Sequence, residues 1–235
     1  MSLIVRELLL LLVSTINKII KRNNLTRRRA RYKPKEVNYP YLKAGESNYL
    51  HQFDLIGPRY LKDDGRFYSG NIIDAYDRRV SINPTRRQTK IDIAYDLIYS
   101  WMELGIPYYL QLDNILSIRG SNLYPHSFGL VIRLCLSLGI QPIFIPIREP
   151  WRNGIIEHFQ NVFDKMFFRA QYFKDFAHLC RKAKDFEVFH NQNHRYSTMG
   201  GMTPKEKFKG DINLLPTSFR LSERLALWIK ICYAK

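Results

Sequence analysis

The sequence predicts an α/β fold in which a mixed five-stranded sheet carries helices on both of its faces. Apolar periodicity gives the order strand, strand, strand, helix, strand, helix, strand, helix. Three strands come first and the later strands alternate with helices, an order that indicates a mixed sheet. Hydrophobic residues make up 46% of the 235 residues and aromatic residues 14%, so the chain can bury a core and wholesale disorder is not expected.

Each strand is predicted from a short apolar run bounded by polar or turn residues. The strands are expected in residues 49–57, in two runs within 65–88 that meet at the polar step DRR, in 106–114 and in 140–147. Two amphipathic helices should end at Gly105 and Gly139, because glycine is a common helix stop. Cys135, inside the second of these, is expected in the core.

A third helix is predicted to begin within the segment EPWRNGIIEHF, residues 149–159. Its apolar stripe is formed by Ile156, Phe159, Phe163, Met166 and Phe167. The opposite side carries Glu157, Gln160, Asn161, Asp164 and Lys165. A further long helix should follow residue 174, and the last residues, 210–235, weakly suggest a small β element.

The charge balance is strongly basic, with 37 Lys and Arg against 21 Asp and Glu, a formal charge of +16 and a pI near 9.8. Nucleic acid is the leading partner for such a chain, although a generally basic protein or one that binds anionic lipid has the same composition. Residues 18–35 hold nine Lys or Arg and no acid, which suits either phosphate contacts or a solvated linker. The DNA contacts predicted there are Arg27, Arg28, Arg29, Arg31 and Lys33.

The N-terminal leucine run and the cysteines indicate a cytoplasmic protein with no membrane partner, and the basic charge adds the expectation that it is DNA-associated. Residues 8–13 are too short an apolar run for a membrane span, which needs about 20 residues, and no small-residue cleavage site follows. The three cysteines are widely separated and form no CxxC pair, so neither a structural zinc site nor a disulfide scaffold is expected.

Three carboxylates stand where the predicted strands and helices converge. Asp54 lies within the first strand, Asp113 at the end of the fourth, and Glu157 in the first turn of the helix after the fifth. Strand ends and neighbouring helix starts meet in one crevice of an open sheet. Hard oxygen ligands gathered there suit Mg²⁺ or Mn²⁺, and two such ions can support phosphoryl transfer. Glu157 alone would equally fit a charge that complements the helix dipole.

The segments around these acids resemble the catalytic core of DDE transposases and retroviral-type integrases, which has an RNase H-like fold. They are HQFDLIGPRYLK around Asp54, QLDN around Asp113 and FIPIREPWRNGIIEHF around Glu157, and GMTPKEKF resembles the closing segment. The resemblance covers residues 51–207 and is greatest to insertion-sequence transposases with an integrase core domain.

The resemblance implies a catalytic, metal-binding triad of Asp54, Asp113 and Glu157 with two Mg²⁺ or Mn²⁺ ions. It implies DNA strand cleavage and strand transfer in transposition or integration, on element ends and target DNA, by a homodimer or larger oligomer. Asn114 and Asn153 would lie at the rim of the site. DNA contacts are expected from Arg152, Asn153, Asn161 and Lys165.

The chain also departs from the family pattern. Forty-three residues separate Asp113 from Glu157, more than in the best-known members, and the excess lies in a loop around residues 115–129. The expected division is a helical and basic arm at 1–48, which resembles the end of a helix-turn-helix region, a catalytic core at 49–209 and a tail at 210–235. The short arm suggests an N-terminally truncated copy. A truncated remnant that only binds DNA is therefore an alternative to an active transposase. An RNase H-like nuclease is a weaker alternative.

Several other polar residues are interpreted as solvent-exposed or surface residues rather than as parts of a catalytic or metal site. Asp74 and Asp77 flank the hairpin step and are expected in solvent. His190 and His194 meet one zinc-ligand spacing but lack a third ligand, so DNA or surface contacts are favoured. Phosphate contact and plain solvation are equally good interpretations of four arginines, Arg78, Arg79, Arg86 and Arg87.

Overall fold

The structure, a computed structural model, describes residues 15–16, 18–23, 41–119, 128–146 and 149–209. The chain separates into two compact units, residues 1–39 and 40–235. In the first unit, the described residues from 15 to 22 are helical. The predicted contacts Arg27, Arg28, Arg29, Arg31 and Lys33 and the predicted tail at 210–235 lie outside the described residues.

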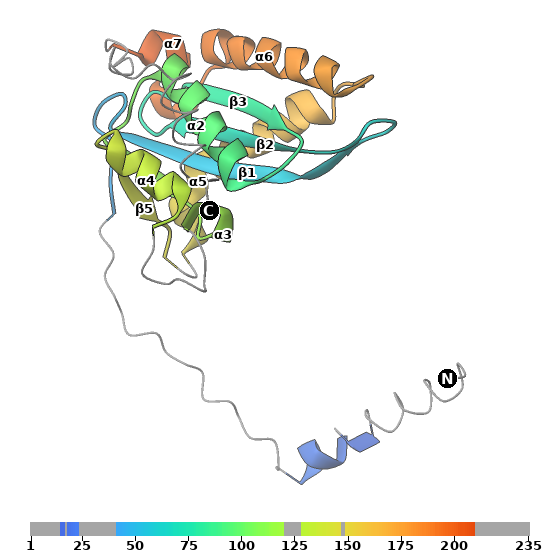
Figure 1. Cartoon of the computed structure of the whole chain (residues 1–235). Coiled ribbons are helices and arrows are strands. Elements are labelled where there is room, and N and C mark those ends of the chain that lie inside the picture. Colours follow the sequence, from blue (N-terminus) through green and yellow to red (C-terminus); the bar gives the residue numbers. More distant parts are fainter. Residues whose placement is uncertain (1–14, 17, 24–40, 120–127, 147–148, 210–235) are drawn as a thin grey trace, which may run out of the picture. The chain divides into compact units, whose positions relative to one another are not determined.

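The second unit is built on one mixed five-stranded sheet, as the sequence predicted (Figure 1). The strands are β1 (Leu50–Leu61), β2 (Gly65–Asp74), β3 (Val80–Thr85), β4 (Tyr109–Leu112) and β5 (Gln141–Phe144). They lie in the order β3-β2-β1-β4-β5. β2 pairs antiparallel with β1 and β3, whereas β4 lies parallel to both β1 and β5. The C-terminal ends of β1, β4 and β5 therefore point the same way.

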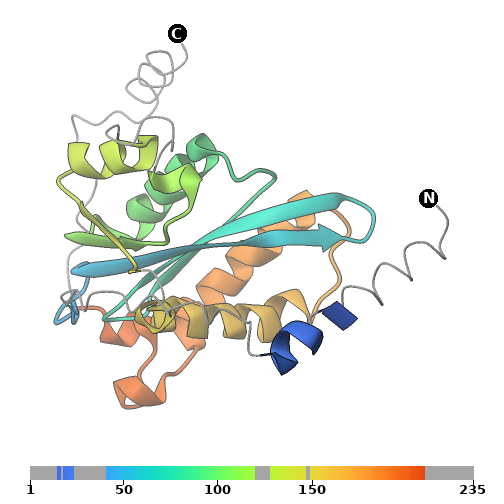
Figure 2. The same cartoon turned by 90° about the horizontal axis from the view of Figure 1, so that it is seen from below.

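Helices cover both faces of the sheet, again as predicted (Figure 2). One face carries α2 (Lys90–Leu104), α3 (Leu116–Arg119) and α4 (Leu130–Ser137). The other carries α5 (Gly154–Phe163), which continues as a π-helical turn η2 (Asp164–Phe168), and α6 (Phe176–Asn193). Short elements complete the unit: η1 (Pro150–Asn153), η3 (Ser197–Met199) and α7 (Pro204–Lys207).

Strand alternation divides the core into two clusters, one on each face. Ile72 and Ile73 are both fully buried, and they point to opposite sides because successive strand residues alternate. The α2 side includes Trp101 and Cys135, which confirms the core position expected for that cysteine. The α5 side is rich in phenylalanine: Phe67, Phe159, Phe163, Phe167, Phe173 and Phe186.

The apolar stripe of the α5 segment was predicted correctly except at Met166. Ile156, Phe159, Phe163 and Phe167 are buried, but Met166 is 45% exposed. The π-helical turn at Asp164–Phe168 inserts an extra residue per turn, so the regular helical spacing on which the prediction rested does not hold there.

Two further expectations concerning polar residues, those for Asp74 and Asp77, were wrong. Asp74 and Asp77 are fully buried rather than solvated, because their carboxylates accept hydrogen bonds from backbone N–H groups of the hairpin turn and of Asn48. Arg79 is buried with them, with its Nε 2.9 Å from Asp77 Oδ2. Nearby charges thus neutralise one another inside the fold.

His190 is also buried and is no surface contact. Its Nε2 lies 2.8 Å from the Tyr196 hydroxyl, and burial lowers its pKa to about 3, so the ring is neutral. Its ring stacks on that of His194, with 5.1 Å between the ring centres.

Within the described part of the chain, no helix is both long and apolar enough to cross a membrane.

Candidate active site

The pairing of β1 with β4 places two of the three predicted carboxylates next to each other. The parallel register aligns Gln52 with Gln111, and continuing it by two residues aligns Asp54 with Asp113, which directly follows β4. Asp113 is close enough for its negative charge to contribute to the raised pKa of Asp54. The two acids thus lie side by side where β4 ends, partway along the longer β1.

Asp54 is the more enclosed of the two. Burial is the main cause of its raised pKa, the charge of Asp113 adds to it, and hydrogen bonds from Gln160 and from the Leu55 backbone N–H oppose it. Asp113 is exposed. A cation placed between them would stabilise the ionised form of both carboxyls, which is the electrostatic setting of a metal-binding pair.

The third predicted carboxylate, Glu157, is brought to the same face of the sheet by α5. Gln160, three residues further along that helix, donates its Nε2 hydrogen to Asp54 Oδ2 at 2.6 Å. Residues three apart share a helix face, so Glu157 lies on the side of α5 that contains Gln160. Both line an open cavity of about 360 Å³ together with Ile56, Arg59, Asn161 and Asp164.

The three acids lie on the same side of the sheet but do not form a compact cluster, and only Glu157 lines the cavity. Glu157 is exposed, and among the residues that the structure describes no three His, Cys, Asp or Glu side chains gather closely enough to hold a metal ion. The amide of Gln160 occupies an oxygen of Asp54. Their donor chemistry fits a hard divalent cation, because all three supply carboxylate oxygens.

Two glutamines, which the sequence analysis missed, hold the start of α5 against the sheet. Gln52 and Gln111 each donate an Nε2 hydrogen to the carbonyl oxygen of Arg152 at 2.9 Å. Gln52 Oε1 also accepts the backbone N–H of Ile156 at 3.1 Å. A signal was present: both aspartates are preceded by the same Gln-x-Asp pattern, which puts each glutamine on the face of its aspartate.

The predicted rim and DNA-contact residues near α5 have different surroundings. Asn153 is only 5% exposed, and its Oδ1 accepts a hydrogen bond from Gln111 at 3.2 Å, which suits an internal support more than a DNA contact. The Arg152 side chain forms an ion pair with Glu149. Asn161 and Lys165 are exposed beside Glu157. Asn114 is half-buried and donates to the carbonyl of Ile145 beyond β5.

The four arginines that could be either phosphate contacts or solvated residues differ in burial and in pairing. Arg79 is buried, and Arg86 pairs with Asp64 at 2.6 Å. Arg87 is exposed, whereas Arg78 is half-buried.

Comparison with known proteins identifies the fold. No protein-family model and no curated protein matches the chain. Among solved structures, it is similar to a chain of the simian T-cell lymphotropic virus intasome in complex with PP2A regulatory subunit B56 gamma, with a TM-score of 0.57, 15% identity and 73% of this chain covered. The match spans 58% of that chain.

The chain is also similar to the HTLV-2 integrase catalytic core domain in complex with magnesium. The trimeric form gives a TM-score of 0.54 with 15% identity, over 71% of this chain and 100% of that one. The dimeric form gives 0.50 with 16% identity, over 70% and 99%. The described residues of the second unit therefore have the α/β fold of an integrase-type, RNase H-like catalytic core.

Proposed function

We propose that this chain is a DDE-type polynucleotidyl transferase that cleaves and joins DNA strands in transposition or integration. The observation that supports the proposal most is the position of Asp54 beside Asp113 on neighbouring parallel strands, with α5, the helix that carries Glu157, joined to Asp54 through Gln160. The integrase-type fold is consistent with it.

Asp54, Asp113 and Glu157 would hold Mg²⁺ or Mn²⁺, with two ions expected. Bound divalent cations activate an attacking oxygen and stabilise a leaving one in phosphoryl transfer. The solved HTLV-2 core, described as a complex with magnesium, supports this choice of metal. The Gln160 amide would give up its hydrogen bond to Asp54 as the carboxylate takes a cation.

The chain's own residues would position these groups. Gln52 and Gln111 fix the start of α5 relative to the strands that carry the two aspartates, so the height of Glu157 above the sheet is set by uncharged hydrogen bonds. Arg59 pairs with Asp164 at 2.7 Å one turn beyond Gln160, which anchors the far end of the same cavity. Geometry held in this way lowers the cost of aligning a phosphodiester.

DNA as the partner is supported by the formal charge of +16, to which the segment from residue 18 to 35 contributes nine cations. A homodimer or larger assembly is supported by the dimeric and trimeric forms described for the HTLV-2 core and by the intasome that contains another similar chain. Element ends and target DNA would be the substrates.

A second candidate is a protein that binds DNA without cutting it. The open arrangement of the acids favours this candidate, since among the described residues no three form a ready metal-binding cluster.

The decisive experiment is a nicking and strand-transfer assay on supercoiled and pre-cleaved DNA, in Mg²⁺, Mn²⁺ or EDTA. We expect metal-dependent products that Asp54→Asn, Asp113→Asn and Glu157→Gln each reduce to the level seen in EDTA. Asp185→Asn, at a carboxylate that is 73% exposed on α6, is the matched control and should retain activity.

The other outcomes separate the alternatives. Retention of DNA without any product in either metal would support the binding protein and contradict the enzyme. Cleavage of RNA–DNA hybrids but not of DNA would identify a ribonuclease instead. Unfolding of all three acid variants would contradict a site at the surface of the crevice, because these carboxylates contribute little to the core.

A further inference from the structure

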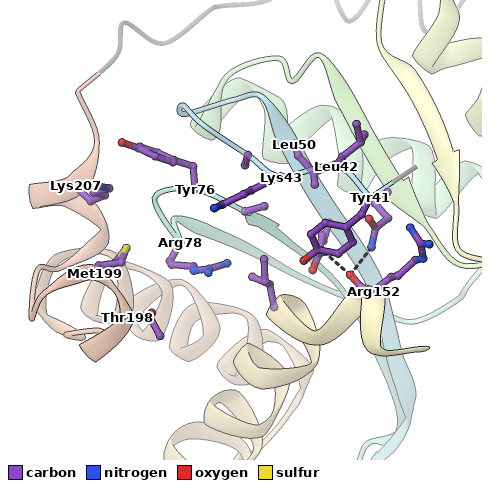
Figure 3. Close-up of a pocket in the computed structure, with 15 residues that line it drawn as sticks. Tyr41, Leu42, Lys43, Leu50, Tyr76, Arg78, Arg152, Thr198, Met199 and Lys207 are labelled. Carbon is purple, nitrogen blue, oxygen red and sulfur yellow. Dashed lines mark hydrogen bonds between the residues drawn. The ribbon is translucent and has the colours of Figure 1, made fainter. Parts of the chain in front are cut away.

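A second cavity, of about 320 Å³, opens beyond the start of α5 (Figure 3). Its walls come from residues 41–44 before β1, the turn between β2 and β3, η1, η3 and α7. Four cationic side chains line it: Lys43, Arg78, Arg152 and Lys207. None of the described residues that line it is Asp or Glu.

Arg78 contributes to the cavity a positively charged side chain in which one nitrogen lacks a hydrogen-bond partner. Its Nη1 is buried and has no hydrogen-bond partner in the described structure, and burial lowers the pKa of its guanidinium. Its backbone has a φ of 67°, which is unfavourable for a residue with a side chain. The two nearby acids are already occupied: Asp74 by backbone N–H groups and His51, and Asp77 by Arg79. A buried guanidinium nitrogen without a hydrogen-bond partner indicates a place where an anion can bind.

Aromatic rings accompany the cations. The Lys207 ammonium lies 4.5 Å from the centre of the Tyr76 ring, and the Arg152 guanidinium lies 5.9 Å from that of Tyr41. Tyr41 is 69% exposed, so one face of its ring is open for stacking. Cations next to open aromatic faces suit a phosphate joined to a planar base.

The cavity and the carboxylate site lie on either side of the start of α5, which Gln52 and Gln111 bind from below. Both glutamines line the cavity, and they precede Asp54 and Asp113 by two residues on the same strand faces, a rise of about 7 Å. A strand bound at the acids would thus have to pass around the start of α5 to place a neighbouring nucleotide in the cationic cavity.

From these observations we infer that the cavity binds one nucleotide of a DNA strand whose neighbouring phosphodiester lies at the carboxylates. Arg78, Lys43 and Lys207 contact its phosphate, and Tyr41 stacks on its base. The inference rests on the proposed function for the identity of the polymer, but the binding itself needs neither metal nor catalysis.

The test is binding of a fluorescein-labelled single-stranded oligonucleotide in EDTA, measured by anisotropy from low to high salt. Removing one phosphate contact should lower the slope of log K against log salt by about 0.7. We expect this for Lys43→Gln, Lys207→Gln and Arg78→Gln, together with weaker binding, and expect Arg78→Lys to restore part of it. Lys62→Gln, at an exposed lysine at the β1–β2 hairpin, is the control of equal charge change and should keep the wild-type slope.

A second readout does not depend on substitutions that disturb folding. The oligonucleotide should protect Lys43 and Lys207, but not Lys62, from acetylation, as measured by mass spectrometry. Arg78→Gln should also raise the melting temperature or leave it unchanged, because it removes a half-buried cation whose Nη1 has no hydrogen-bond partner; a marked loss of stability would mean that Arg78 serves the fold.

Wild-type slopes in all three variants, or equal acetylation with and without DNA, would overturn the inference. Protection by adenosine monophosphate that the oligonucleotide cannot reproduce would overturn the assignment to a strand and indicate a free nucleotide instead. Since all of this is measured without metal, failure here leaves the cleavage assay unaffected, and failure of cleavage leaves this result standing.

Discussion

The Asp96 carboxyl should make the stability of this fold depend on pH. It lies on α2, is 7% exposed, and its Oδ2 is buried without a hydrogen-bond partner in the described structure. Burial, with a smaller contribution from the charge of Asp92, raises its pKa from 3.8 to about 8. The folded state therefore keeps a proton between those two values that the unfolded state has lost, so the contribution of Asp96 to stability is greatest below pH 3.8 and falls as pH rises toward 8.

The size of the effect follows from that interval. Each pH unit inside it costs about 1.4 kcal/mol, so between pH 5 and pH 7 this one group should remove about 2–3 kcal/mol of unfolding free energy. Asp96→Asn has nearly the same shape and cannot ionise. Any constant penalty of the buried amide cancels when the same variant is compared at the two pH values.

The assay is urea unfolding of the wild type and Asp96→Asn at pH 5 and pH 7. We expect the variant's free energy of unfolding, relative to wild type, to rise by about 2–3 kcal/mol between the two conditions. Asp185→Asn should show no such change, because its carboxylate is 73% exposed. A relative stability of Asp96→Asn that stays constant from pH 5 to pH 7 would refute the buried, neutral carboxyl.

Two more substitutions test how the elements are held. Thr89→Ala should cost about 1 kcal/mol, because it removes the capping box in which Thr89 and Asp92 satisfy the first turn of α2, whereas Thr89→Ser should be nearly neutral in thermal unfolding. Asp77→Asn should cost about 3–5 kcal/mol in urea unfolding, because it leaves the buried guanidinium of Arg79 without its ion-pair partner. A loss below 1 kcal/mol there would mean that the carbonyl of Leu104, which also accepts from Arg79, is sufficient.

The elements of the core were predictable because their signals are local. Alternation and helical periodicity located all five strands and the helices after them, and the contiguous first three strands indicated the mixed sheet. The approach of Asp54 to Asp113 was also within reach, since parallel strands end at the same edge of a sheet.

What the sequence did not reveal depends on side chains that only folding brings together. Asp77 looks like a turn residue until it pairs with the buried Arg79. His190 looks like a polar helix residue until Tyr196 caps its ring. The bond from Gln160 to Asp54 joins residues 106 positions apart, and no periodicity predicts such a pair.

The shared carbonyl of Arg152 has a consequence for how such a protein would respond to its surroundings. Its two donors, Gln52 and Gln111, are neutral amides, so neither acidity nor ionic strength should loosen the attachment of the start of α5 to the sheet. Contacts between lysine or arginine and phosphate weaken steeply with salt. DNA binding and the alignment of the acids should therefore respond differently to salt. A rise in salt would release the bound strand, whereas the position of α5 relative to the two aspartates would not change.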